Sequence, residues 1–185
     1  DKDGNIINPG VFIPIAEDVG FIKDIEKIIL KKAILEAEPL LKKHNLKLAL
    51  NLSIKQFLER DYIDLLAKYG KSKDFLEIEI TESIAFDNVT FLEKTVSELK
   101  SKGFLISIDD FGTGFSSLSL LKNIPIDVLK IDQSFFRESI HKEKDNIVIK
   151  GIIDLVNKLS IRTVAEGIET AEQVAFLKSV NCNMI

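Results

Sequence analysis

A strand and a glycine-rich turn meet in the segment Asp109-Asp110-Phe111-Gly112-Thr113-Gly114-Phe115-Ser116-Ser117. The residues before it, 104–108, are mostly apolar and predict a short buried strand, and residues 116–122 predict a short amphipathic segment. Two adjacent carboxylates therefore stand where a strand ends, and ligands in α/β folds gather at that end of the strands. Asp and Gly are also common turn residues. The neighbouring strands also end in polar residues, and this favours a functional site over an ordinary turn.

The composition is that of an ordinary globular protein with a moderate negative charge. The chain has 185 residues, is 45% hydrophobic and 29% charged, and carries a formal net charge of −4. This length predicts one domain over residues 1–185, and the negative charge excludes DNA and RNA as expected partners. Cys182 is the only cysteine, so no intrachain disulfide is expected. No apolar run approaches the ~20 residues of a membrane span. We expect a cytoplasmic location for this segment, whether or not its parent chain is membrane-anchored.

Strands and helices alternate along most of the chain. Strand onsets separated by helical stretches indicate parallel βαβ units. A turn at 1–5 followed by Ile6-Ile7 predicts half of a hairpin, and Pro39 is expected to bend or end the second helix. The expected strands are 46–52, 75–81, 104–109, 127–132 and 161–166, with a sixth beginning near Asn183, and the expected helices are 11–19, 22–43, 62–69, 88–102, 116–122, 146–159 and 170–179.

The strands have one apolar face and one face that becomes polar towards the carboxyl end. In the second strand, for example, Ile78 and Ile80 share one face while Glu77 and Glu79 share the other. A parallel strand buried on both faces is almost continuously apolar, and polar ends left against a helix layer are costly. Closing the strands into a barrel brings the polar ends together at one mouth. The sequence therefore predicts an α/β fold, a (β/α)8 TIM-type barrel that is incomplete in this chain.

Six carboxylates and one lysine converge on the predicted mouth. Carboxylates this close must raise their pKa, form ion pairs or bind a cation. Hard oxygen ligands favour Mg²⁺ or Mn²⁺, and this number could hold two ions, with Asp109 as a natural bridge. The alternative is a buried ion-pair network around Lys130, which one lysine would only partly balance. The converging residues are Asn51, Glu79, Glu82, Asp109, Asp110, Lys130, Asp132 and Glu166.

With these residues in view, the chain resembles the EAL-domain family of bacterial cyclic di-GMP phosphodiesterases. The matching motifs occur in family order over nearly the whole chain, and together they are highly specific. They are Phe12-Ile13-Pro14 with Ala16-Glu17, Asn51-Leu52-Ser53, Glu79-Ile80-Thr81-Glu82-Ser83, the segment 109–117, Lys130-Ile131-Asp132 with Phe135, and Ala165-Glu166-Gly167-Ile168-Glu169-Thr170.

The resemblance implies a phosphodiesterase that linearises cyclic di-GMP to pGpG with two divalent ions, Mg²⁺ or Mn²⁺. It implies that Lys130 and Glu166 position and activate the attacking water. It further implies that Glu82 supports the loop beginning at Asp109 and that Asp132 supports the site. The implied metal ligands are Asn51, Glu79, Asp109 and Asp110.

The resemblance also sets expectations about the parent protein. The family's Glu-Ala-Leu segment would lie before Asp1 and a late Gln after Ile185, so this segment alone is expected to be weakly active or inactive. The loop 111–117 is expected at a homodimer interface, and sensor or GGDEF-type domains are expected in the parent chain. Two alternatives stay open: a catalytically inactive domain that senses cyclic di-GMP, and a dimerisation module.

Overall fold

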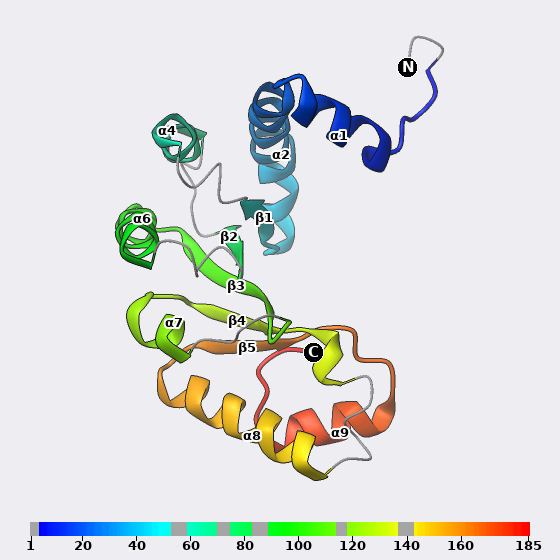
Figure 1. Ribbon diagram of the computed structural model, residues 1–185, viewed down its shortest axis with the longest axis vertical. Helices are drawn as coiled ribbons and strands as arrows, with labels where there is room; N and C mark the ends of the chain where they lie inside the picture. The colour runs from blue at the N-terminus through cyan, green and yellow to red at the C-terminus, as the bar shows by residue number, and fades with distance from the viewer. Residues whose placement is uncertain (1–3, 53–58, 70–74, 83–88, 114–117, 137–142) are drawn as a thin grey trace.

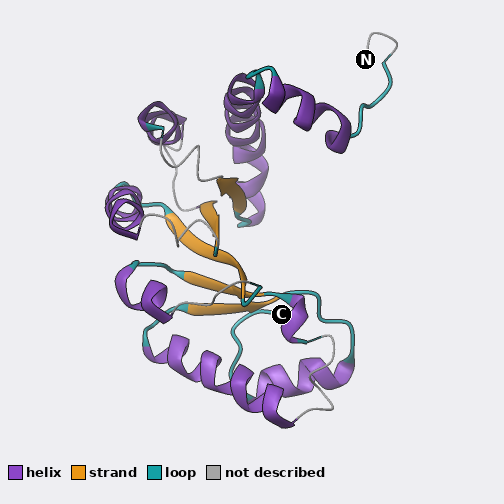
Figure 2. Ribbon diagram, in the orientation of Figure 1, coloured by secondary structure: helices purple, strands orange, loops and turns teal. Residues whose placement is uncertain are grey.

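The computed structural model describes residues 4–52, 59–69, 75–82, 89–113, 118–136 and 143–185. Its centre is a parallel five-stranded sheet with the strand order β1-β2-β3-β4-β5. The strands are β1 (Leu48–Leu52), β2 (Leu76–Thr81), β3 (Leu105–Phe111), β4 (Val128–Ile131) and β5 (Arg162–Ala165). Each strand pairs with the next along the chain (Figures 1 and 2). The predicted α/β class and all five strands are confirmed.

Helices connect successive strands (Figure 1). Two helices, α1 (Pro9–Asp18) and α2 (Ile22–His44), precede β1. The others are α4 (Arg60–Tyr69), α6 (Val89–Ser101), α7 (Leu118–Asn123), α8 (Glu143–Lys158) and α9 (Ala171–Ser179), with a short 3₁₀ helix, η2 (Gln133–Phe135), after β4. The observed helices lie within a few residues of the expected ones. The sixth strand predicted near Asn183 is present as a single parallel bridge between Val164 and Met184.

The helix expected over 22–43 is confirmed: α2 continues through Pro39 to His44, so the proline does not end it, and Leu41 is buried beyond the proline. The half hairpin expected at Ile6-Ile7 was wrong. Ile6 and Ile7 form no strand, and Ile6 is 97% exposed. A strand needs a partner for its backbone groups, and no described strand lies beside these residues.

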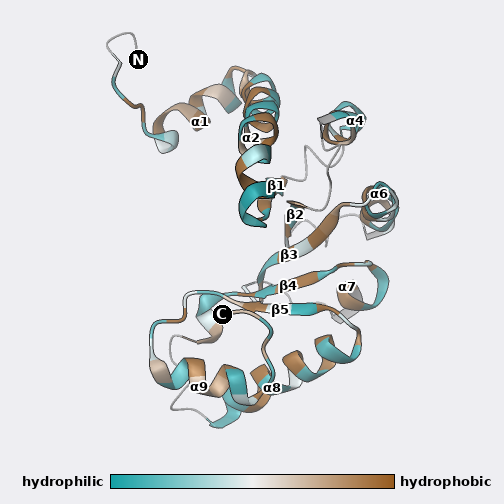
Figure 3. Cartoon of the chain, turned by 180° about the vertical axis from the view of Figure 1, so that it is seen from behind, coloured by the Kyte–Doolittle hydropathy of each residue, from teal (hydrophilic) through white to brown (hydrophobic). Residues whose placement is uncertain are grey.

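The core consists of two clusters of buried apolar side chains. The larger one joins β1 to β4 with helices α2, α4, α6 and α7, and the smaller one joins β4 and β5 to α8 and α9. Figure 3 shows hydrophobic residues along the strands and their alternation with hydrophilic residues along α2 and α8. Burial of Leu76, Ile78 and Ile80 confirms the apolar face predicted for β2. The opposite face carries the polar side chains of the candidate site.

No helix among the described residues is long and apolar enough to cross a membrane.

Candidate active site

The register of the parallel strands places the expected site residues at one edge of the sheet. Asn51 of β1 lies opposite Glu79 of β2, and Thr81 of β2 lies opposite Asp109 of β3. Lys130 is in β4, and Glu166 follows the last residue of β5. Because parallel strands end at a common edge, side chains separated by more than a hundred residues in sequence come together here.

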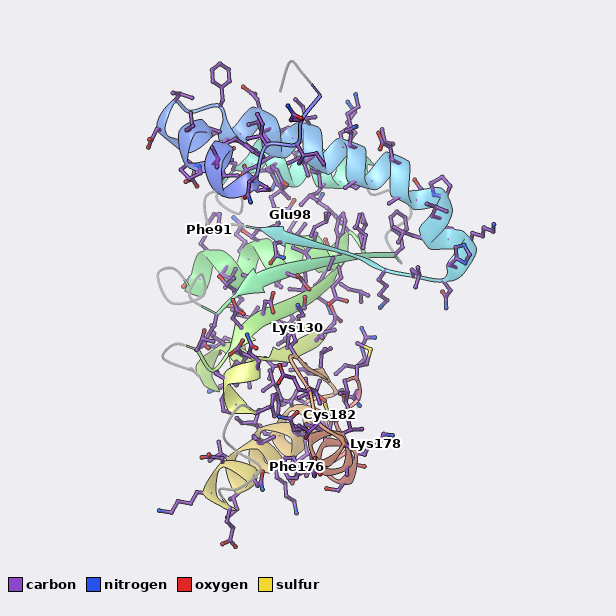
Figure 4. All side chains as sticks on the ribbon, turned by 90° about the vertical axis from the view of Figure 1, so that its right-hand side faces the viewer. Phe91, Glu98, Lys130, Phe176, Lys178 and Cys182 are labelled. Atoms are coloured by element: carbon purple, nitrogen blue, oxygen red, sulfur yellow. The ribbon has the colours of Figure 1, made fainter. Side chains whose placement is uncertain are left out.

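Lys130 forms the centre of the site. Its Nζ lies 2.9 Å from Oε1 of Glu79, 3.1 Å from Oδ1 of Asp109 and 2.8 Å from Oε1 of Glu166. Figure 4 shows Lys130 near the middle of the molecule, between the helices α1 and α2 at one end and α8 and α9 at the other. One ammonium therefore links the ends of β2, β3 and β5. The ion-pair network considered as an alternative is present, and it uses three of the six carboxylates.

The three carboxylates determine the protonation of Lys130. Burial by itself lowers the pKa of this lysine, but hydrogen bonds to Glu166, Glu79 and Asp109 raise it by more. The net pKa lies above the ordinary value for lysine. Lys130 is therefore a permanent cation at neutral pH.

A bulge in β3 brings Asp110 to the same edge as Asp109. Ile108 pairs with Leu129 and Phe111 pairs with Ile131, so β3 has one more residue than β4 in this interval. Asp110 takes a left-handed conformation with φ of 55°. Simple alternation would send Asp109 and Asp110 to opposite faces, and a bulge re-aims side chains at such a point.

The surroundings of Asp110 oppose its negative charge. Burial raises the pKa of its carboxyl, and the charges of Asp109, Asp132 and Glu166 raise it further, while Lys130 lowers it. Asp110 is nevertheless exposed on the surface. An exposed carboxylate among other carboxylates is a position at which a cation would be favourable.

The remaining expected residues form hydrogen bonds with the strand ends and with the loops that follow them. The amide nitrogen of Asn51 donates to Oε2 of Glu79 at 3.0 Å. Oε2 of Glu82, which follows β2, accepts from the backbone N–H of Gly112 at 2.7 Å. Asp132 caps η2 by accepting from the backbone N–H of Ser134 at 2.8 Å. Glu82 and Asp132 thus fix the segments that follow β2, β3 and β4.

The donor set fits a hard divalent cation in chemistry. Carboxylate and amide oxygens of Asn51, Glu79, Asp109 and Asp110 lie on three adjacent strands, and such oxygens are preferred ligands of Mg²⁺ and Mn²⁺. Oε1 of Glu82 is buried and has no hydrogen-bond partner among the described residues. Within that same part of the chain, no group of three or more His, Cys, Asp or Glu side chains is already arranged to hold a metal ion. Glu79 and Asp109 are instead turned to Lys130.

Sequence reasoning missed one residue that orders this edge. Gln173, in the first turn of α9, is buried and forms three side-chain hydrogen bonds to the segments after β4 and β5. The pattern Thr170-x-x-Gln173 is a capping box, which the sequence alone displays. Of the segment 111–117 expected at a dimer interface, only 111–113 are among the described residues.

Comparisons with known proteins agree with this architecture. A family model described as the EAL domain matches residues 1–185. Over 98% of its length the chain is 41% identical to the signaling protein YkoW of Bacillus subtilis. It is 33% identical, over 97% of its length, to the cyclic di-GMP phosphodiesterase NbdA of Pseudomonas aeruginosa. The chain spans 23% and 24% of the length of these two relatives.

The solved structure of the PaMucR phosphodiesterase in complex with c-di-GMP matches with a TM-score of 0.81 at 36% identity. That match covers 98% of this chain and 76% of the solved one. The likeness confirms the expected fold class, an α/β fold of the TIM-barrel type.

Proposed function

The chain belongs to the EAL domain family, and we propose that it hydrolyses cyclic di-GMP to linear pGpG in a reaction that depends on two divalent metal ions. Two relatives support the substrate: NbdA is described as a cyclic di-GMP phosphodiesterase, and the PaMucR phosphodiesterase was solved with c-di-GMP. The observation that carries the proposal is the position of Lys130, within 3.1 Å of carboxylates from β2, β3 and the end of β5. Anionic metal ligands beside a fixed cation suit phosphodiester hydrolysis, in which negative charge develops on the phosphate in the transition state.

The proposed metal ligands are Asn51, Glu79, Asp109 and Asp110. Bound there, Mg²⁺ or Mn²⁺ would lower the pKa of a coordinated water and offset negative charge on the phosphate. The amide of Asn51 presents an oxygen as well as the nitrogen that contacts Glu79, and these two atoms are exchanged by rotation of the amide. Burial and the charges of neighbouring carboxylates raise the pKa of Asp110, so a bound cation would favour its ionised form.

Glu166 is the proposed general base. It takes a proton from the attacking water, whose oxygen forms a bond to phosphorus while the bond from phosphorus to the 3′ oxygen breaks. The leaving 3′ oxygen is protonated from solvent, and the proton on Glu166 is released later. Glu166 suits this role because it is the most exposed of the three carboxylates that contact Lys130, with 36% of its side chain accessible.

Lys130 positions Glu166 and the attacking water. Its Nζ lies 2.8 Å from Glu166, and its raised pKa keeps it charged throughout the neutral range. A fixed ammonium beside the phosphate stabilises the negative charge that develops in the transition state. Glu82 and Asp132 support the site indirectly. Glu82 holds the backbone of Gly112, and Asp132 caps η2.

The chain is proposed to be one part of a larger cytoplasmic signaling protein. It is 36% identical to, and spans 27% of, the bifunctional diguanylate cyclase/cyclic di-GMP phosphodiesterase MucR of Pseudomonas aeruginosa. A fused sensor or GGDEF-type domain would supply regulation. A homodimer formed through the loop 111–117 belongs to the same proposal.

The test is metal-dependent turnover by the full-length protein. Protein stripped with a chelator should release no pGpG, and added Mg²⁺ or Mn²⁺ should restore pGpG release, which chromatography follows. Binding of cyclic di-GMP is measured in parallel by calorimetry. Binding without turnover at any metal concentration would refute the enzyme and identify the domain as a sensor of cyclic di-GMP.

A further inference from the structure

The short helix η2 contacts the loop that follows β3 and the loop that follows β5, near Asp110 and Glu166. On one side is Gly112, which follows the carboxylates of β3. A Cβ atom added to Gly112 would lie 1.7 Å from Cε2 of Phe135, so the phenyl ring rests directly against the backbone of that glycine. Gly112 has φ of 101°, a conformation that residues with a side chain rarely adopt. The N–H of Gly112 also donates to Oε2 of Glu82, so both Phe135 and Glu82 hold this loop.

The same turn contacts the loop that follows β5. Gly167, next to Glu166, has φ of 65°, and a Cβ atom there would lie 2.5 Å from Cβ of Gln133. The backbone beside Glu166 therefore rests on Gln133, just as the backbone beyond Asp110 rests on Phe135. η2 therefore separates the loop after β3 from the loop after β5, with Phe135 against one and Gln133 against the other.

Gln173 ties this turn to the β5 loop with one buried side chain. Its Nε2 donates to the backbone oxygen of Phe136 at 3.0 Å. Its Oε1 accepts from the backbone N–H groups of Glu169 at 2.7 Å and Thr170 at 2.9 Å. The side chain uses its donor and its acceptor on two different segments, and only 7% of the residue is exposed. In such a buried place water would not replace lost hydrogen bonds.

We propose that Gln173 is a positioning residue for the hydrolysis assigned above. It holds η2 against the β5 loop and thereby sets the distance of Glu166 from Asp109 and Asp110. The inference rests on the proposed function for its catalytic consequence, but the bracing itself does not depend on that function. Gln173 does not contact the reacting atoms. It acts through Glu166.

The expected size follows from the geometry of the proposed water attack. A misplacement of about 1 Å far from the chemistry can cost about 10²-fold in rate. Gln173→Leu removes all three hydrogen bonds and keeps the volume of the side chain. It should lower kcat by about 10- to 100-fold and change KM by less than about threefold, because the interaction lost concerns the transition state rather than substrate binding.

The experiment compares Gln173→Leu with Leu177→Ala in the full-length protein. Leu177 lies on the same helix, is fully buried and packs in the cluster beneath it. Leu177→Ala should destabilise α9 and leave kcat within about twofold of wild type, because it removes packing but none of the three hydrogen bonds of the Gln173 side chain. If Gln173→Leu does not fold, Gly167→Ala is the second variant. Its added Cβ would press on Gln133 and displace η2 from the β5 loop, so kcat should fall in the same way.

Hydrogen exchange supplies a readout without metal or substrate. The amides of Glu169 and Thr170 should exchange at least about tenfold faster in Gln173→Leu, because they lose their acceptor, and should be unchanged in Leu177→Ala. Unchanged exchange in Gln173→Leu would overturn the brace. Faster exchange with wild-type kcat, or an equal loss of kcat in Leu177→Ala, would reduce Gln173 to a structural role and overturn the proposal. A wild-type protein without turnover would overturn the proposed function and the catalytic role with it, while exchange would still decide the brace.

Discussion

Replacing Lys130 with methionine removes the one cation at the centre of the candidate site. Methionine keeps an unbranched apolar stem of similar length, so Lys130→Met mainly deletes the charge. The side chains of Glu79 and Asp109 are 7% and 14% exposed, and Lys130 itself is 15% exposed. Both carboxylates would then be left close together, buried and without the cation they contact.

The expected loss of stability follows from these contacts. A charge pair about 3 Å apart is worth about 5 kcal/mol at an effective dielectric constant of about 20, before the cost of desolvating both groups. Desolvation takes back several kcal/mol per ion, and removing one partner of a buried pair typically costs about 3–5 kcal/mol. The contact with Glu166 is discounted because that side chain is 36% exposed and water screens it. We expect Lys130→Met to lower the free energy of unfolding by about 3 kcal/mol at neutral pH.

Urea denaturation of the metal-free protein, followed by circular dichroism, measures this difference. Lys100→Met is the matched control, because Lys100 pairs with Asp127 and both side chains are partly exposed, at 32% and 21%. Its loss should be about 1 kcal/mol or less. If Lys130→Met unfolds within about 0.5 kcal/mol of wild type, or costs no more than Lys100→Met, the three contacts do not form the network described.

Three further outcomes are expected. Glu166→Gln should lower kcat by about 10²–10⁴-fold without loss of folding, because the general base is gone; chromatography of pGpG checks this, and turnover within a few-fold of wild type would contradict the role. Asp109→Asn should weaken Mn²⁺ binding in calorimetry and abolish hydrolysis, because a ligand loses its charge, whereas an unchanged affinity would remove Asp109 from the ligand set. Burial, aided by the charge of Glu26, raises the pKa of Tyr62 to about 12 from 10.0. The neutral form therefore stabilises the folded state fully below about pH 10. This stability is lost between about pH 10 and pH 12, at about 1.4 kcal/mol per pH unit. Tyr62→Phe should flatten this alkaline decline in urea denaturation, and an equally steep decline in the variant would show that Tyr62 is not its source.

Much of the fold was predictable because the alternation of apolar and polar residues in each strand shows which face is buried. The alternation of Ile78 and Ile80 with Glu77 and Glu79 identifies β2, its two faces and its carboxyl end from the sequence alone. The same alternation locates Lys130 and Glu166 at the corresponding ends of β4 and β5. Once the strands are parallel and adjacent, these ends must meet; that Lys130 contacts three of the carboxylates was only the alternative interpretation of the sequence.

The parts that sequence reasoning missed depend on tertiary contacts. The bulge that turns Asp110 towards Asp109 arises from pairing with β4, and alternation within β3 gives no sign of it. Sequence reasoning left open whether Pro39 ends α2, and the helix continues through it to His44, with Leu41 buried beyond the proline. The capping box of Gln173 is visible in the sequence. Its contact with Phe136 is not, because the two residues are 37 positions apart. A local pattern can indicate a cap, but it cannot indicate what else the capping side chain touches.

Hydrolysis in water enriched in the heavy isotope of oxygen shows whether water attacks phosphorus at this site. We expect the metal-loaded wild type to release pGpG with one heavy oxygen atom in its terminal phosphate, because water activated at this edge attacks phosphorus. Release should stop with a chelator and fall by about 10²–10⁴-fold in Glu166→Gln. Cyclic di-GMP that is bound but recovered intact, or pGpG that forms equally well in Glu166→Gln, would contradict this mechanism.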